Sequence, residues 1–552
     1  MITGSAATHN ISLEPAAEPE GEFGPAEGLG SVPRSWPNTH RRPDVVVRKG
    51  VARLVNTTLT PHQALVEDLL FVADVLDDAG IEFLLVRGND ERPVIAIDQS
   101  LKHRLTDALA VACVDEPLYS KTIDAKTIDS NTTGSKARPP VLVNSGELST
   151  KRKARIFRLY RPRIEPVGGL SYGASTGVEL QLWRFGEEFI DCPVENSLTR
   201  RLLPRSEEVR ATVELFGREW QTLRGMFDPH ASDLRFDIDI VFSWVDGSDI
   251  AFQRARAKRM RSYVVGEGDD SEARYRQIDE LKYALRSVYL FAPWVRKIFI
   301  VTDSPRPAWL DEHPSVQVVR SEEFFTDPEA LPTHNSQAVE SQLQHIEGLS
   351  DHFLYSNDDM FFGRPVQPGM FFSSGGVTKF IEAQTRIGLG ESDPGRSGFE
   401  NAARVNRRLL WERFGRIITR HLEHTAAPLR KDVLLELERE FPEDFARTQR
   451  SQFRSATDIS VTNSLYHYYA MMTGRAVRQE SARVRYVDTT SRAALNSLPG
   501  MLKKREYDLF CLNDGSFPEV SAEERASIVV DFLERYYPIP APWENLAAGP
   551  DA

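Results

Sequence analysis

Apolar side chains begin to recur at helical spacing near residue 60. The apolar face of this predicted helix consists of Leu65, Leu69, Val72 and Leu76. Thr60 is suited to cap its first turn, Pro61 to fill the first helical position, and Gly80 to end it. Short apolar runs follow and predict strands in the stretches IEFLLVRG, PVIAID and VELQLWRF. The pattern therefore predicts a small N-terminal α/β domain over about residues 51–205.

From residue 236 onward, apolar strand-like runs end in acidic residues and alternate with helical stretches. The runs are FDIDIVFSWVD, KIFIVTD, HFLYSNDD and YDLFCLND. Helical spacing marks the stretches YRQIDELKYALRSVYLFA, NSQAVESQLQHIEGL, VTNSLYHYYAMMTG and SAEERASIVVDFLERYYP, the last with Ser521 and Glu524 as a capping box. This alternation predicts an α/β catalytic domain over about 233–545, with a Rossmann-like, mostly parallel sheet and helices on both faces.

Three other segments carry weaker patterns. Residues 1–50 are rich in Ala, Gly, Glu and Pro without periodicity, which predicts a disordered tail. Residues 206–232 are predicted to form a linker helix between the two domains. The Gly-rich, polar stretch RIGLGESDPGRSGFENAARVN, residues 386–406, fits either a mobile lid or a linker, and we favour the linker.

Composition limits the class of protein. The 552 residues include 68 basic and 80 acidic ones, and the resulting formal charge of −12 disfavours nucleic-acid binding. Cys113, Cys192 and Cys511 lie far apart without metal-binding spacing, which indicates buried thiols of a reducing compartment. No apolar run approaches the ~20 residues that span a bilayer, and the N-terminus lacks secretory-signal features. We therefore expect a soluble, cytoplasmic protein.

A basic stretch, KRKARIFRLYRPR at residues 151–163, permits two interpretations. It could form a patch for an anionic polymer or for the inner face of the membrane. It could also be a solvated edge strand that its charges protect from pairing. We favour the edge strand, because the charges follow a strand-like pattern.

Acidic residues stand where the predicted parallel strands end, namely Asp246, Asp303, Asp358, Asp359 and Asp514. The carboxyl ends of parallel strands meet at one edge of a sheet, which is where ligands bind. A single aspartate there commonly caps a turn, and for Asp303 the two interpretations are equal. The adjacent pair Asp358–Asp359 beside Asn357 favours contact with a divalent cation such as Mg²⁺ and with substrate phosphate.

Positive charge and proton acceptors occur in the stretch 415–475. It supplies His421, His424, Arg430, Arg450, Arg454 and Asp458. A lone histidine is more often structural than catalytic, so the residues alone do not distinguish His424 from His421.

Four motifs resemble, in chain order, the conserved regions of the Stealth family. They are DIDIVFSWVDGSD, RQIDELKYALRSVYLFAPWVRKIFIVTD with LPTHNSQAVESQLQHIEGLSDHFLYSNDDMFFG, FPEDFARTQRSQFRSATDISVTNSLYHYYAM, and CLNDG. This family includes bacterial capsular and exopolysaccharide phosphotransferases, among them actinobacterial enzymes that the N-terminal part resembles, and the eukaryotic N-acetylglucosamine-1-phosphotransferase. The resemblance implies transfer of a sugar-1-phosphate from a nucleotide-sugar, a UDP-sugar above all, to a polysaccharide or oligosaccharide hydroxyl, with release of a nucleoside monophosphate.

The resemblance also implies roles for particular residues. His424 would be the base for the acceptor hydroxyl, Arg454 would bind phosphoryl oxygens, and Asp249 would face the nucleotide-sugar. Asp358 and Asp359 would hold Mg²⁺ or Mn²⁺, and Asp358 would also be catalytic. The substrate-binding residues would be Trp244, Asp246, Gly247, Asn335, Ser336, Glu340, Asn357, Asn513 and Asp514.

Two other functions remain open at this point. One is a metal-dependent glycosyltransferase, which would release a nucleoside diphosphate. The other is a non-catalytic polysaccharide-binding protein that uses Ca²⁺ and exposed aromatic platforms. The tryptophans Trp183, Trp244, Trp294 and Trp309 lie in or beside apolar segments, which argues against such platforms. The sequence leaves open whether the protein forms a homo-oligomer.

Overall fold

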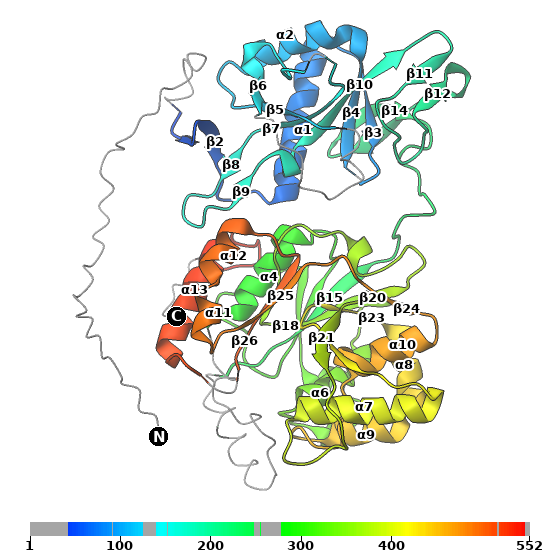
Figure 1. Ribbon diagram of the computed structural model, residues 1–552, viewed down its shortest axis with the longest axis vertical. Helices are drawn as coiled ribbons and strands as arrows, with labels where there is room; N and C mark the ends of the chain where they lie inside the picture. The colour runs from blue at the N-terminus through cyan, green and yellow to red at the C-terminus, as the bar shows by residue number, and fades with distance from the viewer. Residues whose placement is uncertain are drawn as a thin grey trace, which may run out of the picture.

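The computed structural model describes residues 42–90, 92–124, 140–151, 153–247, 254, 278–515 and 518–546. It shows an N-terminal α/β body, drawn in blue to teal, and a second α/β body that begins at β15 (Figure 1). Among the described residues, no helix combines the length and the apolar character needed to cross a membrane.

The second body is built on a five-stranded sheet in the order β17-β16-β15-β18-β23. The strands are β15 Ile238–Ser243, β16 Ile298–Val301, β17 Val316–Val319, β18 His352–Asn357 and β23 Ala427–Arg430. All pairs among the first four strands are parallel, and only β23 runs antiparallel, at the edge beside β18. The prediction of a Rossmann-like, mostly parallel sheet is therefore confirmed.

Helices cover both faces of this sheet because successive strand residues point to opposite sides. In β15, Ile240 and Phe242 pack into one core while Val241 packs into another. The first core includes residues of α4 Glu280–Phe291, α12 Leu498–Lys504 and α13 Ala522–Tyr536. The second includes residues of α6 Ser336–Glu340, α8 Lys431–Glu440 and α10 Tyr466–Met472. Figure 1 shows these two sets of helices on opposite sides of the sheet.

A small second sheet extends the carboxyl end of β18. It consists of β19 Met360–Phe362, β26 Leu509–Asn513 and β25 Val484–Asp488, in the order β19-β26-β25. The remaining elements are α5 Ser321–Phe324, β20 Thr378–Phe380, β21 Glu382–Arg386, α7 Gly398–Phe414, β22 Arg420–Leu422, α9 Pro442–Arg450, a π-helical turn Val461–Leu465, β24 Ala476–Arg478 and α11 Arg492–Leu495. Because only two residues separate β18 from β19, the end of β26 lies beside Asp358 and Asp359.

The N-terminal body has an eight-stranded sheet, a four-stranded sheet and a hairpin. Its elements are β1 Val45–Arg48, β2 Val51–Val55, α1 Pro61–Asp78, β3 Phe83–Arg87, β4 Pro93–Asp98, α2 Lys102–Ala112, β5 Tyr119–Thr122, β6 Val141–Leu142, β7 Ile156–Tyr160, β8 Arg163–Ile164, β9 Ser171–Tyr172, β10 Val178–Phe185, β11 Phe189–Asp191, β12 Leu202–Pro204, β13 Arg210–Leu215 and β14 Arg218–Leu223. The start of α1 is as predicted, because the Thr60 hydroxyl accepts from the backbone amide of Gln63.

Several predictions about elements were wrong. The predicted linker helix at 206–232 is the β13–β14 hairpin, whose Trp220 is buried in the core of the N-terminal body. Residues 45–48 of the predicted tail form β1, and residues 1–41 lie outside the described part. The helix predicted after Asn335 is only the short α6 followed by a 3₁₀ turn. At α13, Ser521 caps the amide of Glu524, while the Glu524 carboxylate pairs with Arg492 rather than closing a capping box.

The basic stretch at 151–163 does not form the predicted edge strand. Its strand, β7, lies between β5 and β10 inside the sheet. Arg158 pairs with Glu179 at 2.9 Å, and Arg161 and Arg163 both bind the buried carboxylate of Asp68. These guanidinium groups therefore neutralise acids within the N-terminal body.

The two bodies touch through α1 and the β8–β9 turn. Ala64 of α1 belongs to the same apolar core as α4, and Gln63 Nε2 lies 3.5 Å from the Tyr289 hydroxyl. At the turn, a Cβ on Gly168 would lie 2.1 Å from the carbonyl oxygen of Arg535, at the end of α13. The absence of a side chain at residue 168 thus permits this close backbone approach.

Candidate active site

Asp359 is the centre of the acidic cluster predicted from the strand ends. It lies in the two-residue turn between β18 and β19, and its Oδ2 accepts a hydrogen bond from Asn513 Nδ2 at 2.8 Å. The Cys511 thiol contributes a weaker hydrogen bond to the same oxygen at 3.4 Å. The other oxygen, Oδ1, is buried and accepts no hydrogen bond from the described residues. Burial raises the pKa of Asp359, and His424 and Asn513 oppose that rise.

His424 interacts electrostatically with this carboxylate and contacts Tyr486 of β25. Its charge lowers the pKa of Asp359, and its ring meets the Tyr486 ring edge-on at a centroid distance of 5.5 Å. The Tyr486 hydroxyl in turn donates to Asn513 Oδ1 at 3.2 Å. His424 is thus linked to the acidic turn by its charge and to Tyr486 by ring packing.

Asp514 continues the acidic edge after β26. Its carboxylate accepts from the Thr489 hydroxyl and lies 3.5 Å from Nε of the buried Arg525. Its negative charge also raises the pKa of Asp359. Asn513 and Asp514 thus join Asp359 at one site, as the sequence predicted.

Arg454 belongs to a neighbouring cluster. Its Nη2 donates to the Ser336 hydroxyl at 2.8 Å, and its charge lowers the pKa of the buried Glu340. Glu340 accepts from the Thr462 hydroxyl at 2.7 Å, although burial raises its pKa overall. Asn335 caps α6 through the Gln337 amide and donates to Asp458 at 2.8 Å. Asn335 and Glu340 therefore serve as internal supports for Arg454 and Ser336.

The start of α7 joins the two clusters. A Cβ on Gly398 would lie 2.6 Å from the Cβ of Arg454. The next residue, Phe399, stacks on His421 at a centroid distance of 4.5 Å and approaches His424 at 5.9 Å. The Arg454 and His424 clusters are thus connected through two consecutive residues.

The first strand contributes Trp244, Asp246 and Gly247 at the same edge of the sheet, since Ser243 lies opposite Asn357 in the parallel β15–β18 pair. Trp244 is 3% exposed, and its Nε1 has no hydrogen-bond partner among the described residues. The Asp246 amide donates to the Ser304 hydroxyl at 2.9 Å. Asp249 lies outside the described residues, so its predicted role stays a prediction.

Two acids near the strands have purely structural partners. Asp303 accepts from the Ser321 amide at 2.9 Å and so caps α5. Asp239, within β15, is buried and pairs with Arg296 at 2.6 Å. These contacts of Asp303 and Asp239 involve no residue of the Asp359 cluster.

Sequence reasoning missed several residues of the site, namely Phe399, Tyr486, Thr489 and Cys511. Cys511 was interpreted as an ordinary buried thiol, and it is indeed free and buried. Only its position two residues before Asn513 on an apolar strand pointed to the site. Tyr486 carried no such signal, because β25 reaches the site through pairing with β26.

The acidic turn fits a divalent cation only in part. Among the described residues, no three His, Cys, Asp or Glu side chains are placed to hold a metal by themselves. Asp359 nevertheless offers an unpartnered, buried carboxylate oxygen next to Asp358. Two carboxylates with substrate phosphates and water are the usual donor set for Mg²⁺.

Comparison with known families identifies four matching regions. The matches are Stealth protein CR1, conserved region 1, over 236–264; CR2, conserved region 2, over 274–380; CR3, conserved region 3, over 423–471; and CR4, conserved region 4, over 499–550. They contain the site residues Asp246, Asp359, His424, Arg454 and Asp514.

Close relatives cover nearly the whole chain. Exopolysaccharide phosphotransferase CpsY of Mycobacterium leprae (strain TN) is 62% identical over 92% of this chain and 91% of its own. CpsY of Mycobacterium tuberculosis (strain H37Rv) is also 62% identical, over 92% and 93%. An exopolysaccharide phosphotransferase of Nocardia farcinica is 53% identical over 90% and 91%. Among solved structures, the galactosyltransferase LgtC aligns with 55% of this chain and 96% of its own, at 12% identity and a TM-score of 0.28.

The fold and the site define an α/β protein with an acidic, histidine-containing site at the carboxyl ends of a parallel sheet. With the four matched regions and the relatives of 62% identity, the chain belongs to the Stealth family.

Proposed function

We propose that this protein transfers a sugar-1-phosphate from a nucleotide-sugar to a hydroxyl of an exopolysaccharide acceptor. The proposal rests on one observation, the meeting of Asp359, His424, Asn513 and Asp514 at one edge of the sheet. It agrees with the printed names of the relatives, which are exopolysaccharide phosphotransferases. Nucleotide-sugars are cytoplasmic metabolites, so we expect the enzyme to act in the cytoplasm.

In the proposed reaction, the acceptor oxygen attacks the β-phosphorus of the donor. A new phosphorus–oxygen bond forms as the bond between the β-phosphorus and the bridging oxygen breaks, and a nucleoside monophosphate leaves with that oxygen. His424 takes the proton of the acceptor hydroxyl. Arg454, which Ser336 orients, binds non-bridging phosphoryl oxygens that carry the negative charge.

The donor diphosphate would bring the cation into the site. Asp358 and Asp359 would hold Mg²⁺ or Mn²⁺, which would neutralise the diphosphate and the leaving phosphate. Asn513 donates to one Asp359 oxygen, and the other, Oδ1, accepts no hydrogen bond from the described residues and would be available to the cation. Trp244, Asp246, Gly247 and Asn357 would line the donor side at the ends of β15 and β18.

The proposal is tested by identifying the nucleotide product. Purified protein is incubated with UDP-, GDP- and CDP-sugars, Mg²⁺ or Mn²⁺ and an oligosaccharide acceptor, and the products are measured by mass spectrometry. We expect a nucleoside monophosphate and an acceptor heavier by one sugar phosphate. Asp359→Asn is expected to lower turnover by about a hundredfold or more, because a charged oxygen at the cation is lost.

Asp303→Asn is the matched control, because Asp303 is also a strand-end acid but only caps α5, a role that asparagine can also perform. It should retain turnover. Release of a nucleoside diphosphate by the wild type would instead establish a glycosyltransferase and contradict the proposal.

A further inference from the structure

A small cavity lies between α7, α9 and the loops beside them. Its volume is about 170 Å³, and its lining includes Arg404 and Arg408 of α7, Arg447 of α9, and the loop residues Ser392 and Thr457. An enclosed space of roughly 150 Å³ accepts a molecule as large as benzene. The cavity therefore has room for one phosphate-sized ion, and none of its lining residues takes part in the proposed transfer.

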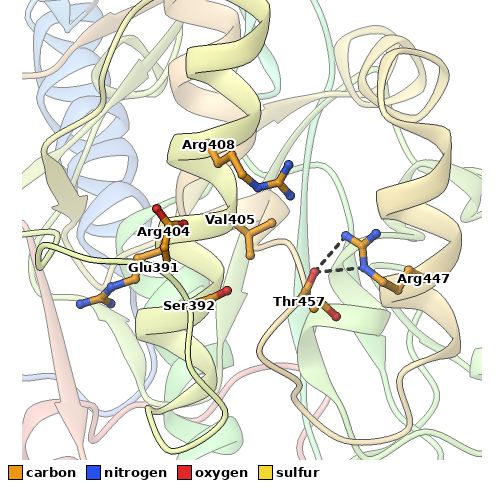
Figure 2. A pocket seen from close by; sticks show the side chains of 7 residues that line it. All are labelled: Glu391, Ser392, Arg404, Val405, Arg408, Arg447 and Thr457. Atoms are coloured by element: carbon orange, nitrogen blue, oxygen red, sulfur yellow. Dashed lines mark hydrogen bonds between the residues drawn. The ribbon is translucent and has the colours of Figure 1, made fainter.

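Two guanidinium groups point into this cavity from opposite walls. Figure 2 shows Arg408 and Arg447 directed toward each other across it, whereas the Arg404 guanidinium points away from both. A guanidinium group presents several N–H donors in one plane, a geometry that matches the oxygens of phosphate. Two such groups that face each other across a gap are suited to bind one phosphate group from both sides.

Both arginines keep donors that no described residue uses. Arg408 donates only from Nη1, to Glu412 at 3.2 Å, and this pair is half exposed and so contributes little to stability. Arg447 donates to the Thr457 carbonyl oxygen from Nε at 3.2 Å and from Nη2 at 3.0 Å, and it pairs with Asp444. Its Nη1 has no partner among the described residues. Neither Glu412 nor Asp444 lines the cavity.

The rest of the lining also suits an anion. Ser392 and Thr457 carry hydroxyl groups, which donate readily to phosphate oxygens. The lining holds three arginines but one carboxylate, that of Glu391, which is exposed to solvent. The cavity therefore favours a negatively charged ligand over a neutral or positive one.

The loop that precedes α7 is fastened to the helix. Arg407 donates to the carbonyl oxygens of Gly388 at 3.0 Å and Gly390 at 3.1 Å. Ser392 follows directly after these residues and so reaches the cavity from a fixed segment. The stretch 386–406, favoured as a linker from the sequence, is therefore a loop and the first turns of α7, which together form one wall of the cavity.

Both walls of the cavity lead to Arg454. On one side, α7 begins at Gly398, where a Cβ would lie 2.6 Å from the Cβ of Arg454. On the other side, Thr457 follows Arg454 by three residues. The next residue, Asp458, holds this loop by accepting from the Ser455 amide at 2.9 Å and the Ser455 hydroxyl at 2.7 Å. An anion between the walls would thus connect the two segments that surround Arg454.

We propose that this cavity binds one phosphate group, free or on a small ester, and that the bound group holds α7 and the loop 451–458 together around Arg454. The phosphate is not a reactant here, because it lies between Arg408 and Arg447 rather than at the acidic turn. Binding of the anion is independent of the proposed function. Its effect on the donor rests on that function, since it acts through Arg454.

Binding of inorganic phosphate to the full chain is measured by isothermal titration calorimetry. We expect a dissociation constant of about 1 mM for the wild type, typical of a small ion at a site open to water. Arg408→Gln and Arg447→Gln should each weaken binding by about tenfold, the effect of losing one charged hydrogen-bonded contact. Arg439→Gln is the matched control, because Arg439 is an exposed arginine of α8 outside the cavity, and it should bind phosphate as the wild type does.

Two further comparisons identify the place and the source of the anion. Arg454→Gln should still bind phosphate. Loss of binding in Arg454→Gln, with full binding in Arg408→Gln and Arg447→Gln, would place the anion at the acidic site and overturn the proposal, as would absence of binding by the wild type. Glycerol phosphate tests the source. Binding to the same arginines that is tighter than that of inorganic phosphate identifies an ester as the ligand, and weaker binding identifies free phosphate.

The effect on the donor is measured by steady-state kinetics with and without phosphate. Phosphate should lower the KM for the nucleotide-sugar by about fivefold in the wild type and in Arg439→Gln, at the low end of typical coupling between sites. It should have no such effect in Arg408→Gln or Arg447→Gln. An unchanged KM in a wild type that binds phosphate would overturn the connection to Arg454. Absence of nucleoside monophosphate release would instead contradict the proposed function, while calorimetry would still report on the cavity.

Discussion

Asp359, which we propose to hold the cation, is a buried acid whose charge opposes folding. Its carboxylate sits between apolar strands with one oxygen unpartnered, and burial raises its pKa above the ordinary 3.8. The folded protein therefore holds the proton more tightly than the unfolded chain does. As the pH rises above 3.8, the ionised carboxylate lowers the free energy of unfolding rather than raising it.

At the residue scale we predict that Asp359→Asn melts at a higher temperature than the wild type at pH 7.5. The expected rise is about 2 °C, which corresponds to roughly 1 kcal/mol, because the variant removes a buried charge whose partners only partly offset the cost of burial. The difference should shrink as the pH falls, because the wild-type carboxyl then takes up a proton and loses its charge. Differential scanning fluorimetry across this pH range measures both effects.

The proposed role of Asp359 in holding Mg²⁺ leads to a prediction about thermal stability. Mg²⁺ should raise the melting temperature of the wild type and leave that of Asp359→Asn nearly unchanged, since binding to the folded state alone is stabilising. Asp303→Asn should respond to Mg²⁺ as the wild type does. A lower melting temperature for Asp359→Asn at pH 7.5 would show that the carboxylate is compensated after all.

At the scale of elements, α7 joins the two halves of the site through close packing. Its first residue, Gly398, leaves room for Arg454, and Phe399 packs on His421. Helical glycines usually weaken a helix, so a glycine at this place indicates a packing requirement. The start of the helix thereby packs against both Arg454 and His421.

We predict that Gly398→Ala lowers kcat by roughly tenfold to a hundredfold, because the new Cβ displaces Arg454 from its position. Its melting temperature should change little, since the gain in helix propensity offsets part of the clash. Steady-state kinetics with the nucleotide-sugar measure the loss.

Gly500→Ala is the matched control for this variant. Gly500 lies in α12, and a Cβ there would meet no atom within 4 Å. The variant should be active and more stable by about 0.5–1 kcal/mol. Full activity in Gly398→Ala would show that α7 does not position Arg454.

At the scale of the whole molecule, the N-terminal body contacts the second body partly through its own main chain. The β8–β9 turn approaches the end of α13 at Gly168, and α1 packs beside α4. Arg505 donates to the Arg535 carbonyl oxygen at 2.8 Å, on the same carbonyl that Gly168 approaches. The contact between the two bodies thus depends on the close approach of the Gly168 backbone to the Arg535 carbonyl group.

We predict that Gly168→Ala loosens this docking and splits thermal unfolding into two transitions. The new Cβ cannot be accommodated at 2.1 Å from a carbonyl oxygen, so the turn must move away. Calorimetry measures the transitions, and hydrogen exchange should rise at the end of α13. Gly173→Ala, whose Cβ would lie 3.8 Å from Tyr160, should unfold as the wild type does. A single unchanged transition in Gly168→Ala would contradict the docking.

Local sequence determined the central sheet and its helices. The strands of the parallel sheet were predictable because each apolar run is buried on both faces and ends in polar residues, and α1 and α4 were predictable from their helical periodicity. The strand-end rule also placed Asp359 and Asp514 at one site correctly. The position at a strand end did not distinguish Asp359 and Asp514 from Asp303, which caps α5. An aspartate at a strand end can either cap a helix or take part in a site.

The partners of the buried charges and the aromatic residues of the site were decided only by the tertiary structure. The basic stretch at 151–163 looked like an exposed edge because its acidic partner, Asp68, is about ninety residues away in the chain. Tyr486 and Phe399 reach the site only through strand pairing and helix packing, for which no local pattern exists. Hydrophobic periodicity reports which residues are buried, whereas the neighbours of a buried charge depend on contacts between distant segments.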